Sequence, residues 1–181
     1  ASIIMSADKV KEFGLKPVAK FKYYTTIGCR PDEMGVGPRY AIPKLMKLAG
    51  MDIQDIGLFE INEAFASQAL YSIRELSIDM EKVNIHGGAI ALGHPLGCTG
   101  AKLATQAIHE IARRGGRYAM VTMCVGGGMG ASSVLWRLFY DKKLVLSTGN
   151  PQTIGICSCF VSGMCSWCCW LYVIEKKRFL H

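Results

Sequence analysis

Hydrophobic residues recur with two different periods along residues 1–138. Segments with apolar positions three and four residues apart have the spacing of amphipathic helices; they cover 7–13, 38–49, 64–76 and 101–114. Short apolar runs of strand length lie around them, at 1–6, 18–27, 56–61, 118–124 and 131–138. Because strands and helices alternate along the chain, the pattern predicts an α/β layered domain. The last two strands are expected to pair antiparallel across a glycine turn.

Helix boundaries are marked by residues with special backbone preferences. Gly14 and Gly50 follow two of the expected helices, and Pro38 suits the first position of another. Residues 115–116 are both glycine and break the chain after the last helix. Residues 29–38 hold two prolines and two glycines and are expected to form a loop.

One run, residues 84–100, is too rich in glycine to be an ordinary helix or strand. It contains five glycines, two histidines, a proline and a cysteine. Glycine permits positive φ and close backbone approach, and proline fixes φ. The run is therefore expected to be a loop that presents His94 and opens a helix near Cys98 or Thr99. A histidine in such a turn is more often structural than catalytic, so its meaning depends on other segments.

Two further segments place polar or reactive side chains at the ends of expected strands. Asn62 follows the strand at 56–61, and Cys124 ends the strand at 118–124. Open α/β sheets carry their sites at strand ends. Taken singly, Asn62 is typical of a strand-end cap and Cys124 of an inert buried thiol. Together with His94 they form a usable acid–base set, and we expect His94 and Cys124 to meet across one cleft with Asn62 beside them.

The same three segments resemble the signatures of the thiolases, enzymes that cleave or form 3-ketoacyl-CoA. The segments are 62–66, 87–100 and 124–130, in the family's order and approximate spacing. Residues 62–68 are most similar to the 3-ketoacyl-CoA thiolases of fatty-acid β-oxidation. The resemblance covers roughly residues 1–137 and only the C-terminal part of a thiolase.

The resemblance implies an α/β fold with a five-stranded mixed sheet packed with helices, one of two similar halves. It divides the chain into three parts. Residues 1–30 would end the N-terminal half, 31–138 would form the C-terminal domain, and 139–181 would be an atypical hydrophobic, cysteine-rich tail. The family's nucleophilic cysteine lies in the N-terminal half, so the resemblance implies a fragment that lacks it.

Site roles are carried over from the family by position. His94 would activate the nucleophilic cysteine and stabilise a thioester oxyanion, with a water held by Asn62. Cys124 would give a proton to the acetyl enolate, and the Gly126 N–H would join a second oxyanion hole. A histidine titrates near neutrality and suits the first role. Three more residues would line the acyl or pantetheine channel: Met34, Ala64 and Phe65.

The function implied is an acyltransferase, acetyl-CoA C-acyltransferase, that cleaves 3-ketoacyl-CoA by thiolysis. Coenzyme A would be a co-substrate, with no cofactor or metal. The family implies a homodimer formed through the N-terminal half, and a peroxisome, with mitochondrion or cytosol as alternatives. Two other functions stay open: a non-catalytic module that binds CoA or a subunit, and a biosynthetic acetyl-CoA acetyltransferase. The isolated chain is expected to be inactive; Cys98, at a helix start, is the tempting substitute nucleophile, although the family pattern makes it a packing position.

Charge argues against nucleic-acid binding. The net charge of +7 arises at the two ends, since residues 1–30 and 134–181 each contribute +4 and residues 31–133 contribute −1. A nucleic-acid binder is expected to carry a basic face on its folded domain.

The tail has a different character from the rest. Residues 154–174 hold no charged side chain and precede a basic cluster at 176–178. A span of about 20 apolar residues can cross a bilayer, so a membrane anchor is one reading. An aberrant C-terminus outside the folded domain is favoured, because the tail is rich in Cys, Ser and Gly. A zinc site on its paired cysteines is weaker still, because no histidines accompany them. Truncation after Tyr140 is expected to leave a domain that folds at least as well.

Overall fold

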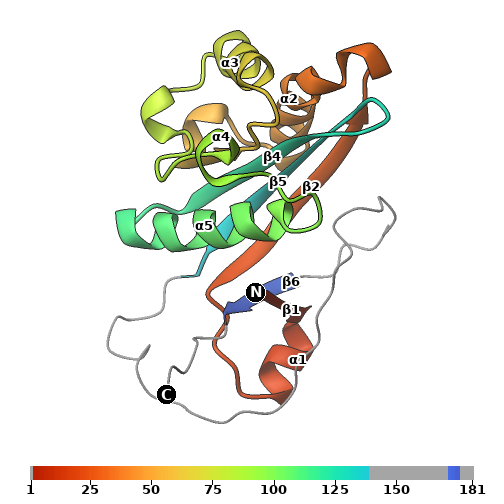
Figure 1. Ribbon diagram of the computed structural model, residues 1–181. Coiled ribbons are helices and arrows are strands. Elements are labelled where there is room, and N and C mark those ends of the chain that lie inside the picture. The colour runs from red at the N-terminus through yellow and green to blue at the C-terminus, as the bar shows by residue number, and fades with distance from the viewer. Residues whose placement is uncertain (1, 139–170, 176–181) are drawn as a thin grey trace.

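Six strands form one mixed sheet in the computed structural model, which describes residues 2–138 and 171–175. Their order across the sheet is β1-β6-β2-β5-β4-β3 (Figure 1). The strands are β1 Ser2–Ser6, β2 Ala19–Gly28, β3 Leu58–Ile61, β4 Tyr118–Val125, β5 Met129–Arg137 and β6 Leu171–Glu175. The helices are α1 Ala7–Glu12, α2 Gly37–Ala49, α3 Ala66–Glu75, α4 Ala89–Leu92 and α5 Thr99–Arg114, with short 3₁₀ turns η1 Pro31–Val36, η2 Ile53–Asp55 and η3 Met80–Lys82.

Strand pairing confirms the expected hairpin. β4 and β5 are antiparallel neighbours, with Cys124 opposite Gly130 and Val125 opposite Met129. β3 runs parallel to β4, and β2 runs antiparallel to β5. β3 and β4 therefore end at the same edge of the sheet, and that edge carries the candidate site.

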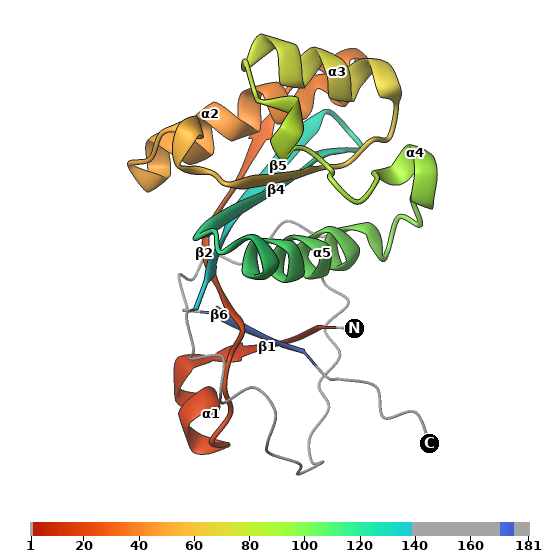
Figure 2. The ribbon, with the colours of Figure 1, turned by 90° about the vertical axis from the view of Figure 1, so that its left-hand side faces the viewer.

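Helices cover both faces of the sheet, as Figure 2 shows, with α2 and α3 on one face and α5 on the other. Side chains alternate along β4 accordingly. Met120 packs with Ile42 and Leu45 of α2, whereas Val121 packs with Leu103 and Ile111 of α5. Strands buried on both faces read as continuous apolar runs, which is why β3 and β4 stood out in the sequence.

Helix ends follow the predicted signals closely. Gly50 and Gly115 adopt positive φ at the C-caps of α2 and α5, the conformation that glycine takes without a steric penalty. α3 begins two residues later than predicted, because Phe65 is extended, with φ −143° and ψ 143°. The short helix α4 was not predicted, because its four residues lie inside the glycine-rich loop.

The layered α/β class is confirmed, but the described strands number six where five were expected. The additional pairing comes from β6, whose residues 171–175 lie between β1 and β2. β1, β6 and α1 lie beyond α5, on the side away from α2 and α3 (Figures 1 and 2). The sheet also crosses the proposed boundary at residue 30, since β2 pairs with β5 from Ala19 to Gly28. The division into three parts stays a prediction.

The readings of the tail fall mainly on residues that the structure does not describe. Of the uncharged run, only 171–174 lie inside a described element, the strand β6. No helix within 2–138 is both long and apolar enough to cross a membrane. The paired cysteines that were considered as a zinc site lie outside the described residues.

Candidate active site

His94 is held through both nitrogens of its ring. It lies in the loop between α4 and α5, after Gly93, whose φ of +90° suits glycine. Its Nδ1 lies 2.6 Å from the Oγ1 of Thr99, the first residue of α5. Its Nε2 lies 3.2 Å from the Nδ2 of Asn62, at the end of β3. The ring thus joins the start of one helix to the end of one strand.

These contacts define which ring nitrogen of His94 carries the hydrogen when the ring is neutral. The Thr99 hydroxyl donates to the Pro95 carbonyl oxygen at 3.0 Å, and a hydroxyl has a single proton to give. Its oxygen therefore accepts from the Nδ1–H of His94. The Nε2 lone pair then accepts from the Asn62 amide. This tautomer leaves a basic nitrogen at the site edge of the ring.

Asn62 is buried and is held in place by hydrogen bonds to its backbone N–H and carbonyl groups. Only 1% of the residue is exposed. Its N–H donates to the Thr122 carbonyl of β4 at 2.9 Å, and its own carbonyl accepts from the Gln68 side chain at 2.8 Å. Its Oδ1 is buried and has no hydrogen-bond partner among the described residues. An unmatched buried acceptor beside His94 suits a polar ligand or a water.

Cys124 lies at the same edge of the sheet, two residues beyond the Thr122 carbonyl that binds Asn62. Burial raises the pKa of its thiol, and the nearby Cys29 raises it further. Within the described chain, no hydrogen bond joins Cys124 to His94 or Asn62. The structure therefore brings Asn62 and His94 together, and the meeting of His94 with Cys124 across one cleft stays a prediction.

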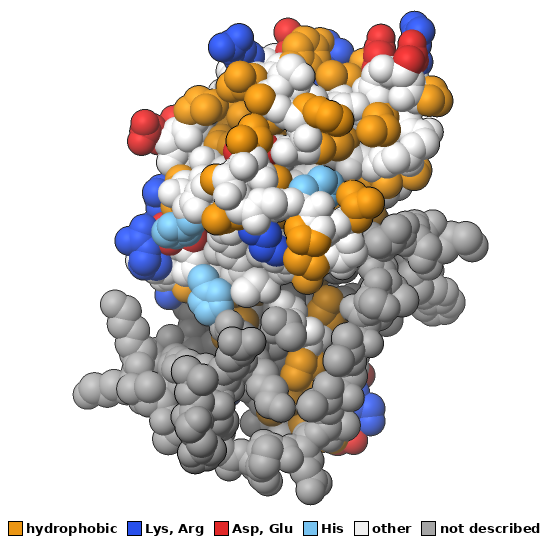
Figure 3. All heavy atoms as spheres, viewed as in Figure 1, with side chains coloured by type: hydrophobic (Ala, Val, Ile, Leu, Met, Phe, Trp, Pro, Cys, Tyr) orange, Lys and Arg blue, Asp and Glu red, His pale blue; other side chains and the backbone are white. Residues whose placement is uncertain are grey.

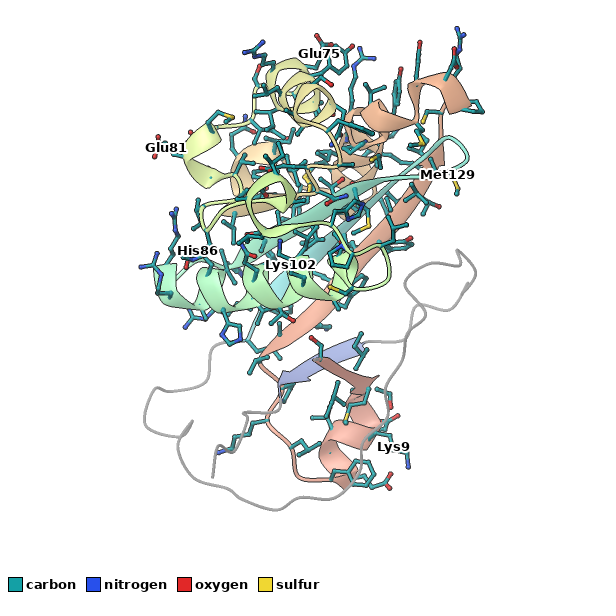
Figure 4. The ribbon with its side chains drawn as sticks, viewed as in Figure 1. Lys9, Glu75, Glu81, His86, Lys102 and Met129 are labelled. Carbon is teal, nitrogen blue, oxygen red and sulfur yellow. The ribbon has the colours of Figure 1, made fainter. Side chains whose placement is uncertain are left out.

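The glycine turn after Cys124 is docked against the start of η1. The Cys29 N–H donates to the Gly128 carbonyl at 2.8 Å. Gly128 has φ +90°, and a Cβ there would lie 2.5 Å from the Cys29 carbonyl oxygen. At Gly126 a Cβ would meet nothing within 4 Å, and its N–H makes no hydrogen bond to another described residue. In Figure 4 the labelled Met129 marks the tip of this hairpin.

Met34 and Phe65 line one open cavity of about 740 Å³ between η1, α2 and α3. Arg39, Tyr71 and Gln68 line it as well. Phe65 is 59% exposed. The alternative interpretation of Phe65 as a buried aromatic of the hydrophobic core is therefore wrong. The third channel residue of the prediction, Ala64, is not part of this lining.

Two buried glutamates behind the site have opposite electrostatics. Burial raises the pKa of Glu60 from its ordinary 4.5 to about 7, against the lowering effect of the Lys102 ammonium, with Glu63 and Glu110 adding to the rise. Neither carboxylate oxygen of Glu60 has a hydrogen-bond partner among the described residues. Lys102 is the fourth residue of α5 (Figure 4).

Glu110 is equally buried but fully partnered. Arg113 donates two hydrogen bonds to it, and Arg114 and His86 add one each. These bonds, those from Arg113 above all, lower the pKa of Glu110 to about 2. Charged hydrogen-bond donors thus outweigh the effect of burial at this position.

Several residues of the site were not indicated by the sequence pattern. Thr99 was considered only as a helix start, and Glu60 only as part of a strand. Asn84 and Glu63 fasten the histidine loop by side-chain hydrogen bonds. The signal that could have found Asn84 is its place between a short apolar segment and paired glycines, where an Asx side chain often replaces a backbone partner.

Metal ligation has no support in the part of the chain that the structure describes. No three side chains of His, Cys, Asp or Glu gather there as a metal site would require. Cys29, Cys98 and Cys124 are free thiols, and Cys98 is exposed.

Comparison with known proteins gives the family. The family model described as "Thiolase, C-terminal domain" matches residues 15–137, so the chain belongs to the thiolase family. The 3-ketoacyl-CoA thiolase of Bacillus subtilis is 58% identical over 134 residues, 74% of this chain and 34% of that protein. The peroxisomal 3-ketoacyl-CoA thiolase B of Rattus norvegicus is 52% identical over 135 residues, 74% of this chain and 32% of that protein. The chain spans about a third of the length of these relatives.

Solved structures of the family share the fold. Human mitochondrial 3-ketoacyl-CoA thiolase in complex with CoA is similar with a TM-score of 0.71 and 44% identity, covering 74% of this chain and 34% of that one. The peroxisomal thiolase of Saccharomyces cerevisiae gives a TM-score of 0.68 and 46% identity, covering 72% and 37%. The thiolase-like fold expected from the sequence motifs is confirmed.

Proposed function

We propose that this chain supplies the C-terminal catalytic domain of a 3-ketoacyl-CoA thiolase. Such an enzyme is an acyltransferase that cleaves 3-ketoacyl-CoA to acetyl-CoA and a shortened acyl-CoA in fatty-acid β-oxidation. The observation that carries the proposal is the His94 ring, held between Asn62 and Thr99 with the Nε2 lone pair at the site edge. The position of His94 in a thiolase motif supports its assignment as the base.

His94 is the base in this proposal. Its Nε2 takes the proton of a cysteine thiol that the rest of the enzyme supplies, and the thiolate adds to the keto carbon. The ring then carries protons on both nitrogens. The Asn62 amide gives up its hydrogen bond to Nε2 in this step, and the new Nε2–H donates to the oxyanion while Thr99 still accepts from Nδ1–H. Preorganised donors of this kind account for much of the rate enhancement of acyl transfer.

Cys124 and Gly126 act on the other side of the reaction. Breaking the bond between Cα and Cβ leaves the enolate of acetyl-CoA, which needs a proton. Because burial raises the pKa of Cys124, its thiol is protonated at neutral pH and suits a donor. The Gly126 N–H is the second oxyanion donor in this proposal, supported by its lack of an acceptor among the described residues. CoA then accepts the acyl group and regenerates the nucleophile.

The proposal includes a second core domain and CoA as co-substrate, with no cofactor or metal. The yeast peroxisomal thiolase is described as five layers built from two core domains of identical topology, and as a dimer. Large apolar side chains beside His94 are exposed here: Ile90 at 65%, Leu92 at 55% and Leu96 at 79%. Figure 3 shows hydrophobic side chains spread over the face that carries α3 and α4. A partner domain resting there would cover them and bring the nucleophile to His94.

The compartment belongs to the proposal too. A peroxisome is favoured by the names of the rat and plant relatives. The human mitochondrial and Bacillus relatives keep a mitochondrion or a cytosol open.

A chimera tests the function. This chain replaces the matching C-terminal third of the Bacillus subtilis thiolase, and thiolysis of acetoacetyl-CoA is measured. We expect turnover, and a fall in kcat of about 10²–10⁴ for His94→Ala, the usual range for a lost acid–base group. Lys47→Ala, on the solvent side of α2, is the control. A folded chimera without turnover, or one indifferent to His94→Ala, would contradict the proposal.

A further inference from the structure

Glu63 joins the two segments whose side chains meet at the site. It follows Asn62 directly in sequence, and both of its carboxylate oxygens accept hydrogen bonds from the histidine loop. Oε1 accepts from the Nδ2 of Asn84 at 2.7 Å. Oε2 accepts from the backbone N–H of Ile90, in α4, at 3.1 Å. One side chain therefore holds both the beginning and the middle of the loop.

Asn84 completes the attachment from the loop side. Its Oδ1 accepts from the Ile61 N–H and its Nδ2 donates to the Ile61 carbonyl, both at 2.8 Å. The side-chain amide thus pairs with β3 as a neighbouring strand would. Asn84 has φ +44°, a conformation that Asn tolerates better than most residues. It is buried, with 9% exposure.

Gly88 leaves space for this arrangement. A Cβ built at residue 88 would lie 2.0 Å from the Glu63 Cδ and 2.2 Å from both carboxylate oxygens. Its φ of −95° and ψ of −163° are open to any residue. The glycine is therefore required by the Glu63 carboxylate and not by the backbone.

We propose that Glu63 and Asn84 are positioning residues that set the Asn62–His94 contact by fastening the loop 84–94 to the end of β3. The inference rests on the proposed function only for its effect on turnover. Without this attachment, Asn62 would stay fixed by β4 through Thr122. His94 would keep its bond to Thr99, and the loop's other side-chain hydrogen bonds would run to α5, through Glu110 and Gln106. The 3.2 Å contact between the Asn62 and His94 side chains would then be the part that loosens.

Glu63→Gln is the sharpest single test, because it keeps the size of the side chain. The carboxylate faces two N–H donors, and an amide can accept from only one of them. We expect the Ile90 amide to exchange its hydrogen at least tenfold faster in the full chain, and the His94 ring signals to move in NMR spectra. His109 ring signals should stay in place. Glu81→Gln makes the same change on an exposed carboxylate away from the site (Figure 4) and is the matched control.

A double-mutant cycle protects the test against general unfolding. Gly88→Ala should displace the His94 signals when Glu63 is present, and should add little once Glu63→Ala has removed the clashing carboxylate. Equal effects of Gly88→Ala in both backgrounds would overturn the inference. Unchanged Ile90 exchange and His94 signals in Glu63→Gln would overturn it as well.

The chimera adds a readout that a purely structural role would not give. Glu63→Gln should lower kcat about tenfold and leave KM within about twofold, the pattern of an interaction that matters in the transition state. If the parent chimera has no turnover, the proposed function fails, while the exchange and ring signals of the chain still decide the positioning role. If the parent chimera is active and Glu63→Gln leaves its kcat unchanged, the positioning role of Glu63 is contradicted.

Discussion

The two sides of the candidate site are built to different degrees. On the His94 side, both ring nitrogens have partners and the loop is tied to β3 by Glu63 and Asn84. On the Cys124 side, a half-buried thiol and the Gly126 N–H have no described partner that relates them to His94. The difference teaches that the described chain holds the His94 ring in a defined orientation by itself. No hydrogen bond within the described residues fixes the Cys124 thiol relative to that ring.

The largest expected effect is the absence of catalysis by the isolated chain. None of the three cysteines that the structure describes makes a hydrogen bond to His94, so none of them is paired with that ring as an activated nucleophile would be. Purified chain should show no thiolysis of acetoacetyl-CoA above the uncatalysed rate. A turnover that disappears in Cys98→Ser would break the comparison, because it would make the exposed thiol at the start of α5 the nucleophile.

Gly128→Ala should damage the Cys124 side and spare the His94 side. The added Cβ would meet the Cys29 carbonyl at 2.5 Å and Pro31 at 3.0 Å, in a backbone with φ +90°. Strain of this kind costs about 1–3 kcal/mol, before the clash is added. Gly127→Ala is the control, since it has φ +86° and no atom within 4 Å. Denaturant unfolding should show that Gly128→Ala is less stable than Gly127→Ala. If the His94 ring signals move as much as the Cys124 signals in NMR spectra, the two sides of the site are not independent and the prediction is wrong.

Glu60→Gln should change the pH dependence of stability. The folded pKa of Glu60 is raised from 4.5 to about 7, so its stabilising effect is present below pH 4.5 and is lost as the pH rises through 7. The ionised carboxylate then destabilises the fold by about 3 kcal/mol. Glu60→Gln should therefore be the more stable form at pH 8 and lose this advantage near pH 4.5. If the melting temperatures of Glu60→Gln and the parent chain differ by the same amount at pH 8 and at pH 4.5, then Lys102 fully compensates the charge of Glu60.

Glu110→Gln gives the opposite sign. With a folded pKa lowered to about 2, Glu110 stabilises the fold above pH 4.5, and this contribution is lost as the pH falls toward 2. Removing the charge at pH 7 should cost about 2 kcal/mol, a value reduced for the exposed arginines that surround it.

The smallest expected effect concerns thiol reactivity. Cys98 is exposed, whereas Cys124 is partly buried with a raised pKa. Because the thiolate is the reactive form, alkylation at pH 7 followed by peptide mass mapping should modify Cys98 at least tenfold faster. Faster labelling of Cys124 would mark it as an activated thiol and remove its role as a proton donor.

Much of the fold could be predicted from the sequence, because it depends on local patterns. The helix α5 and the strands β3, β4 and β5 follow their apolar periods, and the motifs placed Asn62 and His94 at one edge. What the sequence could not show depends on contacts between distant segments. The Glu63–Ile90 and Asn84–Ile61 hydrogen bonds, and the place of β6 in the sheet, arise only once the chain has folded.

The same limit applies to charge. Glu60 and Glu110 look alike in the sequence, yet one lacks hydrogen-bond donors and the other binds two arginines and a histidine. Their opposite pKa shifts come from those partners, which belong to other turns and other elements.

The tautomer of His94 tests the central claim most directly, because the claim is that Nε2 carries no hydrogen and can take one when the Asn62 amide gives up its hydrogen bond. Long-range ¹H–¹⁵N correlation spectra of the labelled full chain, at a pH where the ring is neutral, report which nitrogen carries hydrogen; His94→Gln identifies the signals. We predict a protonated Nδ1 and an unprotonated Nε2, as the Thr99 and Asn62 contacts require. A ring protonated on Nε2 would contradict the account, because His94 could not then accept the proton of a nucleophile at that atom.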